Sequence, residues 1–241
     1  LLKNMNLDYF HIFSPLLYCS FVSFSKKYFK PLNNENLYLI IFRKIHNINL
    51  SLLSFGMFYI FTIGQYQEDK FSQFNNFICK SYNNNVNSWW AANLFLWSKY
   101  LEWGDTLFLI LFNKPISWLQ YTHHMSTAFL MYFNMNDNLS PYLYLPIASN
   151  CLVHIPMYWY FAYPKGFLYK FRKIITYSQI IQHISVLILI SYTYYNRDTC
   201  PQNYYGNIFG LALYSMYLLF FINLFISKYI KSDKNYYKLK T

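Results

Sequence analysis

The chain has 241 residues, of which 55% are hydrophobic, 24% aromatic and only 12% charged. Soluble domains carry about a quarter charged residues, so this composition excludes an ordinary soluble domain and predicts an integral membrane protein. The formal net charge of +11 would suit nucleic acid, but the basic residues lie between apolar segments, which argues against a nucleic-acid-binding surface.

Seven apolar segments predict seven transmembrane helices in an all-α integral membrane protein. Most of them approach the ~20 residues that a bilayer requires, and they lie at about 9–25, 48–64, 88–112, 116–135, 141–163, 174–195 and 206–227. Residues 32–47 are expected to form an interfacial amphipathic helix that leads into the second span. The polar run 75–87 is interpreted as a loop, and the whole chain, 1–241, is expected to be one membrane domain.

Basic residues predict the orientation of these helices. They concentrate in the loops at 26–47, 113–115 and 164–173 and after residue 227, whereas the alternate loops hold few. Loops rich in lysine and arginine face the cytosol. The N-terminus is therefore expected on the lumenal or exterior side, and 228–241 is expected to form a basic cytosolic tail. The net charge has a second use in attracting anionic lipid or a phosphate-bearing ligand.

Three ionisable residues interrupt the third apolar segment. Lys99, Glu102 and Asp105 are spaced i, i+3, i+6, which predicts that they share one helical face and that the lysine neutralises one acid. Ionisable residues inside an apolar run indicate a functional site. Asp105 and His124 are nearly equidistant from the turn at Lys114, so we expect this carboxylate to support the imidazole. A helix–helix salt bridge beside a structural histidine pair is the simpler alternative.

Polar residues on four of the expected spans lie at a similar depth. Counted from the cytosolic end of each span they fall roughly 7–14 Å below that face; they are Asp105, His123, His124, His154, Gln179 and Gln182. Asn150, His154 and Tyr158 also share one face of the fifth span. A common depth predicts a polar chamber, whereas polar residues that only hold helices together need no common level. His183 fits either reading, and His11 and His46 are expected to be interfacial.

The histidine content limits the chemistry of such a chamber. Di-iron desaturases need about eight imidazoles, and six histidines, two of them outside the chamber, are too few. A zinc ion held by His123, His124 and His154 stays open. The other reaction is acyl transfer, in which a neutral imidazole attacks a thioester and passes the acyl group to a carbanion while a second imidazole handles the proton.

The four cysteines divide by position. Cys19 and Cys151 lie within spans and are interpreted as small apolar residues. Cys79 and Cys200 fall in loops assigned to the oxidising side, where a disulfide and two free thiols are both compatible with the sequence.

Four motifs taken together resemble the signature sequences of the ELO family of very-long-chain fatty acid elongases, over about residues 25–232. They are Lys99-x-x-Glu102-x-x-Asp105-Thr106, His123-His124, Asn150-x-x-x-His154-x-x-Met157-Tyr158 and Gln179-x-x-Gln182. The resemblance implies a seven-helix enzyme of the endoplasmic reticulum membrane. Its implied activity is that of a 3-ketoacyl-CoA synthase, which joins a fatty acyl-CoA to malonyl-CoA with loss of CO2 and CoA and needs no cofactor or metal.

The resemblance also implies a role for each matching residue. His123 corresponds to an imidazole that accepts the acyl group, His154 to its partner, and His124 to a residue that lines the site. The implied orienting residues are Lys99, Glu102, Asp105, Gln120, Asn150, Tyr158, Gln179 and Gln182, and Cys79 and Cys200 match a lumenal disulfide. The stretch EWGDTLFLIL is similar to the branch that acts on saturated and monounsaturated chains.

One position departs from the family pattern. The usual histidine box is HxxHH, and Gln120 stands at its first position. Glutamine donates and accepts hydrogen bonds but does not titrate. Gln120 can therefore orient His123, but it cannot shuttle a proton.

We expect the helices to enclose a tunnel with the acyl tail toward the lumen. The CoA head is expected among cytosolic basic residues, namely Lys114, Lys170, Arg172 and Lys173. Expected partners are acyl-CoA, malonyl-CoA, membrane lipid and the reductases and dehydratase of the elongation cycle, and a homodimer is left open. The alternative is a seven-helix transporter or receptor whose polar cluster binds a ligand or relays protons; the lack of repeat symmetry argues against it.

Overall fold

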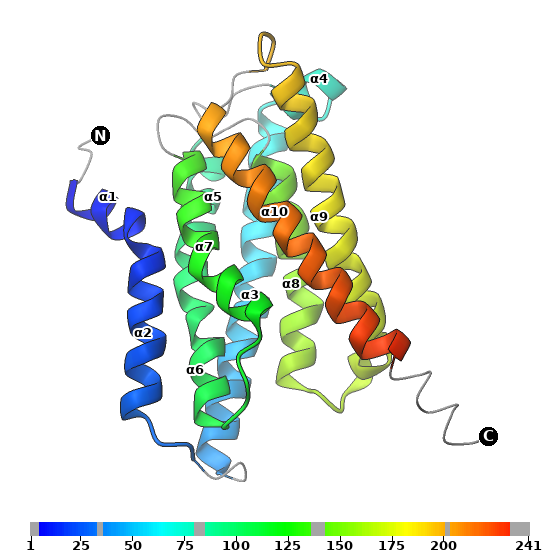
Figure 1. Cartoon of the computed structure of the whole chain (residues 1–241). Helices are drawn as coiled ribbons and strands as arrows, with labels where there is room; N and C mark the ends of the chain where they lie inside the picture. The colour runs from blue at the N-terminus through cyan, green and yellow to red at the C-terminus, as the bar shows by residue number, and fades with distance from the viewer. Residues whose placement is uncertain (1–4, 33–35, 80–84, 136–142, 201–202, 232–241) are drawn as a thin grey trace.

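The computed structural model describes residues 5–32, 36–79, 85–135, 143–200 and 203–231. All regular secondary structure in these ranges is helical (Figure 1). The α-helices are α1 (Met5–Ile12), α2 (Ser14–Tyr28), α3 (Leu37–Gln67), α4 (Phe74–Cys79), α5 (Val86–Leu101), α6 (Trp103–Leu111), α7 (Trp118–Met135), α8 (Tyr144–Ala162), α9 (Arg172–Tyr195) and α10 (Tyr204–Phe225). A 3-10 helix (Phe167–Phe171) precedes α9, and a π-helix (Ile226–Lys231) extends α10.

Three of these helical segments are long and apolar enough to cross a membrane: Leu37–Gln67, Phe167–Tyr195 and Tyr204–Lys231. Several helices begin where the sequence provides a cap. The side chains of Asn36, Asn85 and Asn203 accept a hydrogen bond from a main-chain N–H in the first turn of α3, α5 and α10. Such caps satisfy N–H groups that have no partner within the helix.

Contacts among the described helices close a ring. In order around the ring, α3 packs on α8, α8 on α9, α9 on α10, α10 on α7, α7 on α5, and α5 on α3. Helix α2 lies outside this ring against α6 and α7, at one edge of the molecule in Figure 1. The ring matters for function because it leaves an interior that no single helix pair could enclose.

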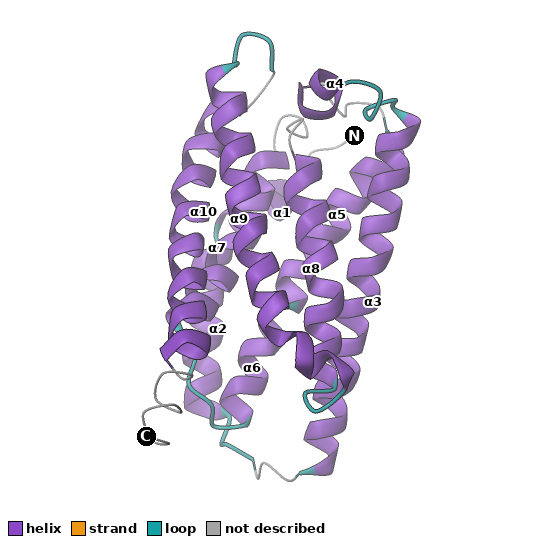
Figure 2. Cartoon of the chain, turned by 90° about the vertical axis from the view of Figure 1, so that its right-hand side faces the viewer, coloured by secondary structure: helices purple, strands orange, loops and turns teal. Residues whose placement is uncertain are grey.

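A disulfide between Cys79 and Cys200 ties α4 to the turn that follows α9, across 121 positions of sequence. Figure 2 shows both segments at the same end of the bundle, which we call the disulfide end. The pairing that the resemblance implied is therefore present. Cys19 and Cys151 are free thiols, and Cys151 is buried.

The boundary predicted between an interfacial helix at 32–47 and the second span is wrong, because α3 is one continuous helix from Leu37 to Gln67. The basic residues Arg43 and Lys44, which suggested a boundary, lie within this helix. The Arg43 guanidinium lies 4.8 Å from the ring of Phe112, and Lys44 Nζ lies 4.2 Å from the ring of Tyr163. Cation–π contacts on long aliphatic stems let a helix carry charge without interruption.

Three further predicted boundaries differ from the structure. The first span, 9–25, is divided into α1 and α2, with a proline in the first turn of α2, where its fixed φ suits a helix start. The third span, 88–112, is divided into α5 and α6 at Glu102. The predicted loop 75–87 begins instead with α4, and its residues 80–84 lie outside the described residues, as do 232–241 of the tail.

Candidate functional site

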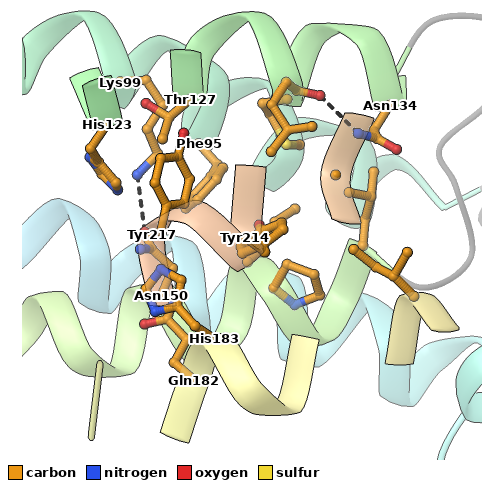
Figure 3. Close-up of a pocket in the computed structure, with 17 residues that line it drawn as sticks. Phe95, Lys99, His123, Thr127, Asn134, Asn150, Gln182, His183, Tyr214 and Tyr217 are labelled. Carbon is orange, nitrogen blue, oxygen red and sulfur yellow. Dashed lines mark hydrogen bonds between the residues drawn. The ribbon is translucent and has the colours of Figure 1, made fainter. Parts of the chain in front are cut away.

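Two adjacent pockets, which share part of their lining, occupy the interior of the ring. The inner pocket, of about 50 Å³, extends toward the disulfide end between α5, α7, α8, α9 and α10 (Figure 3). The outer pocket, of about 220 Å³, opens toward the other end. Four residues line both pockets and so mark their junction: His123, Asn150, Gln182 and His183. His123, Asn150 and Gln182 belong to the polar set picked out from the sequence, whereas His183 fitted either reading.

A buried ion pair stands beside this junction. Lys99 Nζ lies 2.7 Å from Glu102 Oε1, and both side chains are only 2% exposed. Lys99 Nζ also donates to Asn150 Oδ1 at 3.0 Å, a contact drawn in Figure 3. The predicted i, i+3 pairing is thus present, and the hydrogen bond from Lys99 to Asn150 joins α5 to α8. A buried charge that is both paired and hydrogen-bonded avoids most of the cost of leaving water.

The same network defines the tautomer of His154. Because the Asn150 Oδ1 atom accepts from Lys99, its Nδ2 group is the one that faces His154 Nε2, at 3.2 Å. An amide nitrogen donates, so Nε2 is the unprotonated, accepting nitrogen. The Nδ1–H of His154 then faces Glu102 Oε1, at 3.5 Å. His154 is therefore held as a neutral imidazole with its proton directed at a carboxylate.

His123 and His124 differ in their surroundings although they are neighbours on α7. The His124 side chain is buried, with Nδ1 4.0 Å from Glu102 Oε2, and neither atom has a hydrogen-bond partner among the described residues. The ring of His123 lies 5.2 Å from that of Tyr217. No hydrogen bond engages the His123 ring within the described part of the chain. His123 therefore offers an uncommitted imidazole nitrogen where the two pockets meet.

Asp105 does not take the role that the sequence predicted for it. Its Oδ1 pairs with His46 Nε2 at 3.1 Å, and its Oδ2 accepts a hydrogen bond from the Tyr158 hydroxyl at 3.0 Å. Glu102, and not Asp105, is the carboxylate beside His124. Lys99 and Asp105 are six positions apart, and because each helical residue turns by about 100° their side chains lie on different faces. The division between α5 and α6 separates the two side chains further.

His46 is a site residue that the sequence analysis placed at the interface. It reaches Asp105 from α3 because the facing position on α6 is a glycine: a Cβ at Gly104 would lie 2.7 Å from His46 Cε1. His46, Asp105 and Tyr158 thus form a chain of polar contacts from α3 to α8. Tyr158 in turn packs edge-on against the His154 ring, at 5.1 Å between centroids. In the sequence, the only feature that pointed to the contact between His46 and Asp105 was Gly104, the small residue next to Asp105.

The predicted glutamines line the outer pocket. Gln120 Nε2 lies 3.5 Å from Thr106 Oγ1 and makes no hydrogen bond with His123 in the described residues. Gln179 Nε2 contacts Met157 Sδ at 3.3 Å. The Nδ1–H group of His183 donates a hydrogen bond to the carbonyl oxygen of Gln179, in the same helix. The glutamine side chains therefore form a polar part of the lining of the outer pocket. Gln120 is not positioned to orient His123 directly.

Of the four predicted cationic residues, only Arg172 lines the outer pocket. Lys114, Lys170 and Lys173 are exposed on the surface and do not line it. Lys228, from the π-helix after α10, lines the pocket instead. Sequence position alone could not tell which of these basic residues line the pocket, because all of them lie in segments predicted to face the cytosol.

Glu102, His123 and His124 place one potential ligand atom each within 4.8 Å of one another, a set that could hold a metal ion. The Lys99 ammonium group competes for the same carboxylate at 2.7 Å. His154, the third ligand of the zinc site that the sequence left open, is occupied at Nε2 by Asn150. Lys99 and Asn150 therefore already contact two of the groups that a metal ion would use.

Apolar helices of membrane-spanning length and an interior pocket with three histidines around a buried carboxylate indicate a helical membrane protein with a polar interior site. Comparisons with known proteins show the family to which the chain belongs. The chain matches the family described as ELO: GNS1/SUR4 family over residues 5–236, and it belongs to that family.

Three relatives illustrate the range of the match. Fatty acid elongase A of Dictyostelium discoideum is 29% identical over 245 residues, covering 99% of this chain and 89% of the relative. Fatty acid elongase sre1 of the same organism is 28% identical over 213 residues, covering 86% and 79%. Very long chain fatty acid elongase 6 of Rattus norvegicus is 31% identical over 161 residues, covering 64% and 59%.

Proposed function

We propose that this chain is a fatty acid elongase that condenses a long-chain acyl-CoA with malonyl-CoA to give 3-ketoacyl-CoA, CO2 and CoA. The observation that carries the proposal is the position of His123, whose uncommitted imidazole lies where a narrow inner pocket meets a wider polar one. An acyl chain requires the first kind of space and a CoA thioester the second. Family membership and relatives named fatty acid elongases support the same reaction.

In the proposed mechanism His123 attacks the acyl-CoA carbonyl. The carbon–sulfur bond breaks, and the CoA thiolate leaves with the proton that the imidazole gives up. Malonyl-CoA then loses CO2, and the electron pair of the broken carbon–carbon bond forms the new bond to the acyl carbon. The bond to the imidazole breaks, and the imidazole regains a proton. The cycle thus consumes one proton. We assign His154, whose Nδ1 lies 3.5 Å from Glu102 Oε1, as the residue that holds this proton.

The membrane arrangement forms part of the proposal. Seven spans with the C-terminus in the cytosol, in the endoplasmic reticulum membrane, would place the disulfide end in the lumen, where disulfides persist. Arg172 and Lys228 would then meet CoA phosphates from the cytosolic side. The acyl tail would extend into the inner pocket. No cofactor is required, and the other elongation-cycle enzymes would take up the product.

The test is malonyl-CoA incorporation by microsomes that contain the protein. Labelled malonyl-CoA with saturated acyl-CoA primers should give 3-ketoacyl products, and His123→Ala and His154→Ala should abolish them at unchanged protein level. His11→Gln is the matched control, because His11 is also buried but lies outside both pockets and can keep its hydrogen bond to Tyr100 as glutamine. Incubation with acyl-CoA alone should add an acyl group to the peptide that contains His123.

Absence of incorporation with every primer would refute the elongase function and favour the transporter or receptor alternative. Incorporation that persists in His123→Ala would refute the assigned nucleophile while leaving the reaction intact.

A further inference from the structure

The orientation of the His123 imidazole, the proposed nucleophile, is fixed by something other than a hydrogen bond. Within the described part of the chain its ring contacts are with His124 and Tyr217, at 5.3 Å and 5.2 Å between centroids. His124 is the next residue on α7, whereas Tyr217 approaches from α10. Among the described residues, Tyr217 is therefore the ring that another helix places against the nucleophile.

Tyr217 is itself held at its hydroxyl group. It is 1% exposed, and its phenolic oxygen lies 2.6 Å from Ser126 Oγ on α7. Ser126 has one hydroxyl hydrogen, which it donates to the carbonyl oxygen of Thr122 in its own helix. The hydrogen between the two side chains must therefore come from Tyr217. This bond joins α10 to α7 three positions after His123.

The direction of this hydrogen bond excludes a different role for Tyr217. A tyrosine hydroxyl beside a nucleophile could donate to the oxygen of a thioester carbonyl as negative charge develops on it. The hydroxyl hydrogen of Tyr217 is already donated to Ser126, so it is not available to a substrate. What Tyr217 presents to His123 is its aromatic ring.

The ring of Tyr217 also contacts a second histidine, His183 on α9. Their centroids are 5.9 Å apart and their planes are inclined by 83°, an edge-to-face arrangement. The Nδ1–H group of His183 donates to the Gln179 carbonyl oxygen, so this imidazole is fixed within its own helix. Figure 3 shows His123, Tyr217 and His183 together at one end of the inner pocket. Tyr217 is thus held at its hydroxyl by α7 and at its ring by α9.

We propose that Tyr217 is a positioning residue for the nucleophile, and that its ring, anchored by Ser126, keeps the His123 imidazole directed to where the two pockets meet. This inference rests on the proposed function and adds two residues to it. Ser126 lines neither pocket, so any effect of Ser126 on the reaction passes through a residue that it contacts. An imidazole that rotates more freely spends less time in the geometry of attack, which lowers the rate of reaction and not the affinity for substrate.

The test removes one hydrogen bond from each of its two ends. Tyr217→Phe keeps the aromatic ring, and Ser126→Ala keeps the tyrosine. In microsomes given labelled malonyl-CoA, each variant should lower kcat per unit of protein about three- to tenfold, the range that an aromatic contact is worth. KM for acyl-CoA should change less than about twofold, since an orientation effect acts on the rate.

Two further measurements separate positioning from a general loss of structure. With acyl-CoA alone, the rate at which the peptide containing His123 becomes acylated should fall by the same factor as kcat. The double variant Ser126→Ala/Tyr217→Phe should lie within about twofold of the single variants, because all three lack the same interaction. Either single variant decides the question if the other is not expressed.

Tyr144→Phe is the matched control. The hydroxyl of Tyr144 on α8 also faces a hydroxyl side chain that donates to a carbonyl oxygen four positions earlier, because Thr62 Oγ1 lies 3.4 Å from it and 2.7 Å from the Phe58 oxygen. Neither Tyr144 nor Thr62 lines either pocket. This variant should keep the kcat and the KM of the unaltered protein.

Several results would overturn the inference. A loss of about a hundredfold in Tyr217→Phe with none in Ser126→Ala would mean that the hydroxyl acts on the substrate directly. A raised KM at unchanged kcat would make Tyr217 only a part of the pocket wall, and losses that multiply in the double variant would show that the two residues act independently. Unchanged kcat in both single variants would also refute it. Failure of the unaltered protein with every primer would instead refute the elongase proposal itself.

Discussion

Neutralising Glu102 should destabilise the protein, because the Lys99 ammonium group would then be buried without a counter-charge. The two charged atoms are 2.7 Å apart, and both side chains are 2% exposed. Removing one partner of a buried ion pair costs about 3–5 kcal/mol. Glu102→Gln keeps the shape of the side chain and removes only its charge, so we expect the lower end of that range. For a chain of this size the thermal midpoint should decrease by roughly 6–12 °C.

The double variant Lys99→Met/Glu102→Gln tests the cause. It removes both charges, so its thermal midpoint should return to within about 3 °C of the unaltered protein. The measurement is thermal unfolding of the purified protein in one detergent for all variants, with Gly56→Ala as a surface control. A midpoint unchanged in Glu102→Gln, or losses that simply add in the double variant, would refute the reasoning that the two charges depend on each other.

Four other changes have defined expected results. Cys79→Ser/Cys200→Ser should lose about 2–4 kcal/mol of stability and the reductant-dependent shift in gel mobility. His46→Leu should lower kcat about tenfold with little change in KM, whereas His46→Gln should keep most activity because its amide can donate to Asp105. Arg172→Ala/Lys228→Ala should raise KM for acyl-CoA about tenfold with kcat little changed. Chelators such as EDTA should leave activity unchanged.

Each of these expectations has a contrary outcome. An unshifted gel mobility would mean that the two cysteines are not joined in the protein as isolated. Equal losses in both His46 variants would show that the ring contributes only packing. A fall in kcat without a change in KM in the double cation variant would remove Arg172 and Lys228 from substrate binding, and chelator-sensitive activity restored by zinc would assign a metal to Glu102, His123 and His124.

Local features of the site were accessible from the sequence because they depend on neighbours along one helix. The Lys99–Glu102 pair follows from i, i+3 spacing, and the line from Asn150 through His154 to Tyr158 follows from i, i+4 spacing. The gathering of polar residues from different helices followed from their common depth in the apolar segments. Depth is a one-dimensional quantity, which hydrophobic patterning reports well.

Rotation about each helix axis was not accessible in the same way. Asp105 was assigned to His124 by depth, but its side chain faces α3 and meets His46. Lys228 was counted as part of a basic tail and instead lines the outer pocket. The direction in which a side chain points depends on the packing of its helix against others, and a single sequence does not contain that information.

By itself, then, the amino-acid sequence determined the class of protein, the approximate positions of most of its helices and most of the polar residues that line the pockets. The tertiary structure alone decided that α3 is continuous, that the third span divides at Glu102, and that His123 lies where two pockets meet. It also decided the depth of the inner pocket. The physical reason is that burial and periodicity are properties of one segment, whereas a pocket exists only between helices brought together from distant parts of the chain.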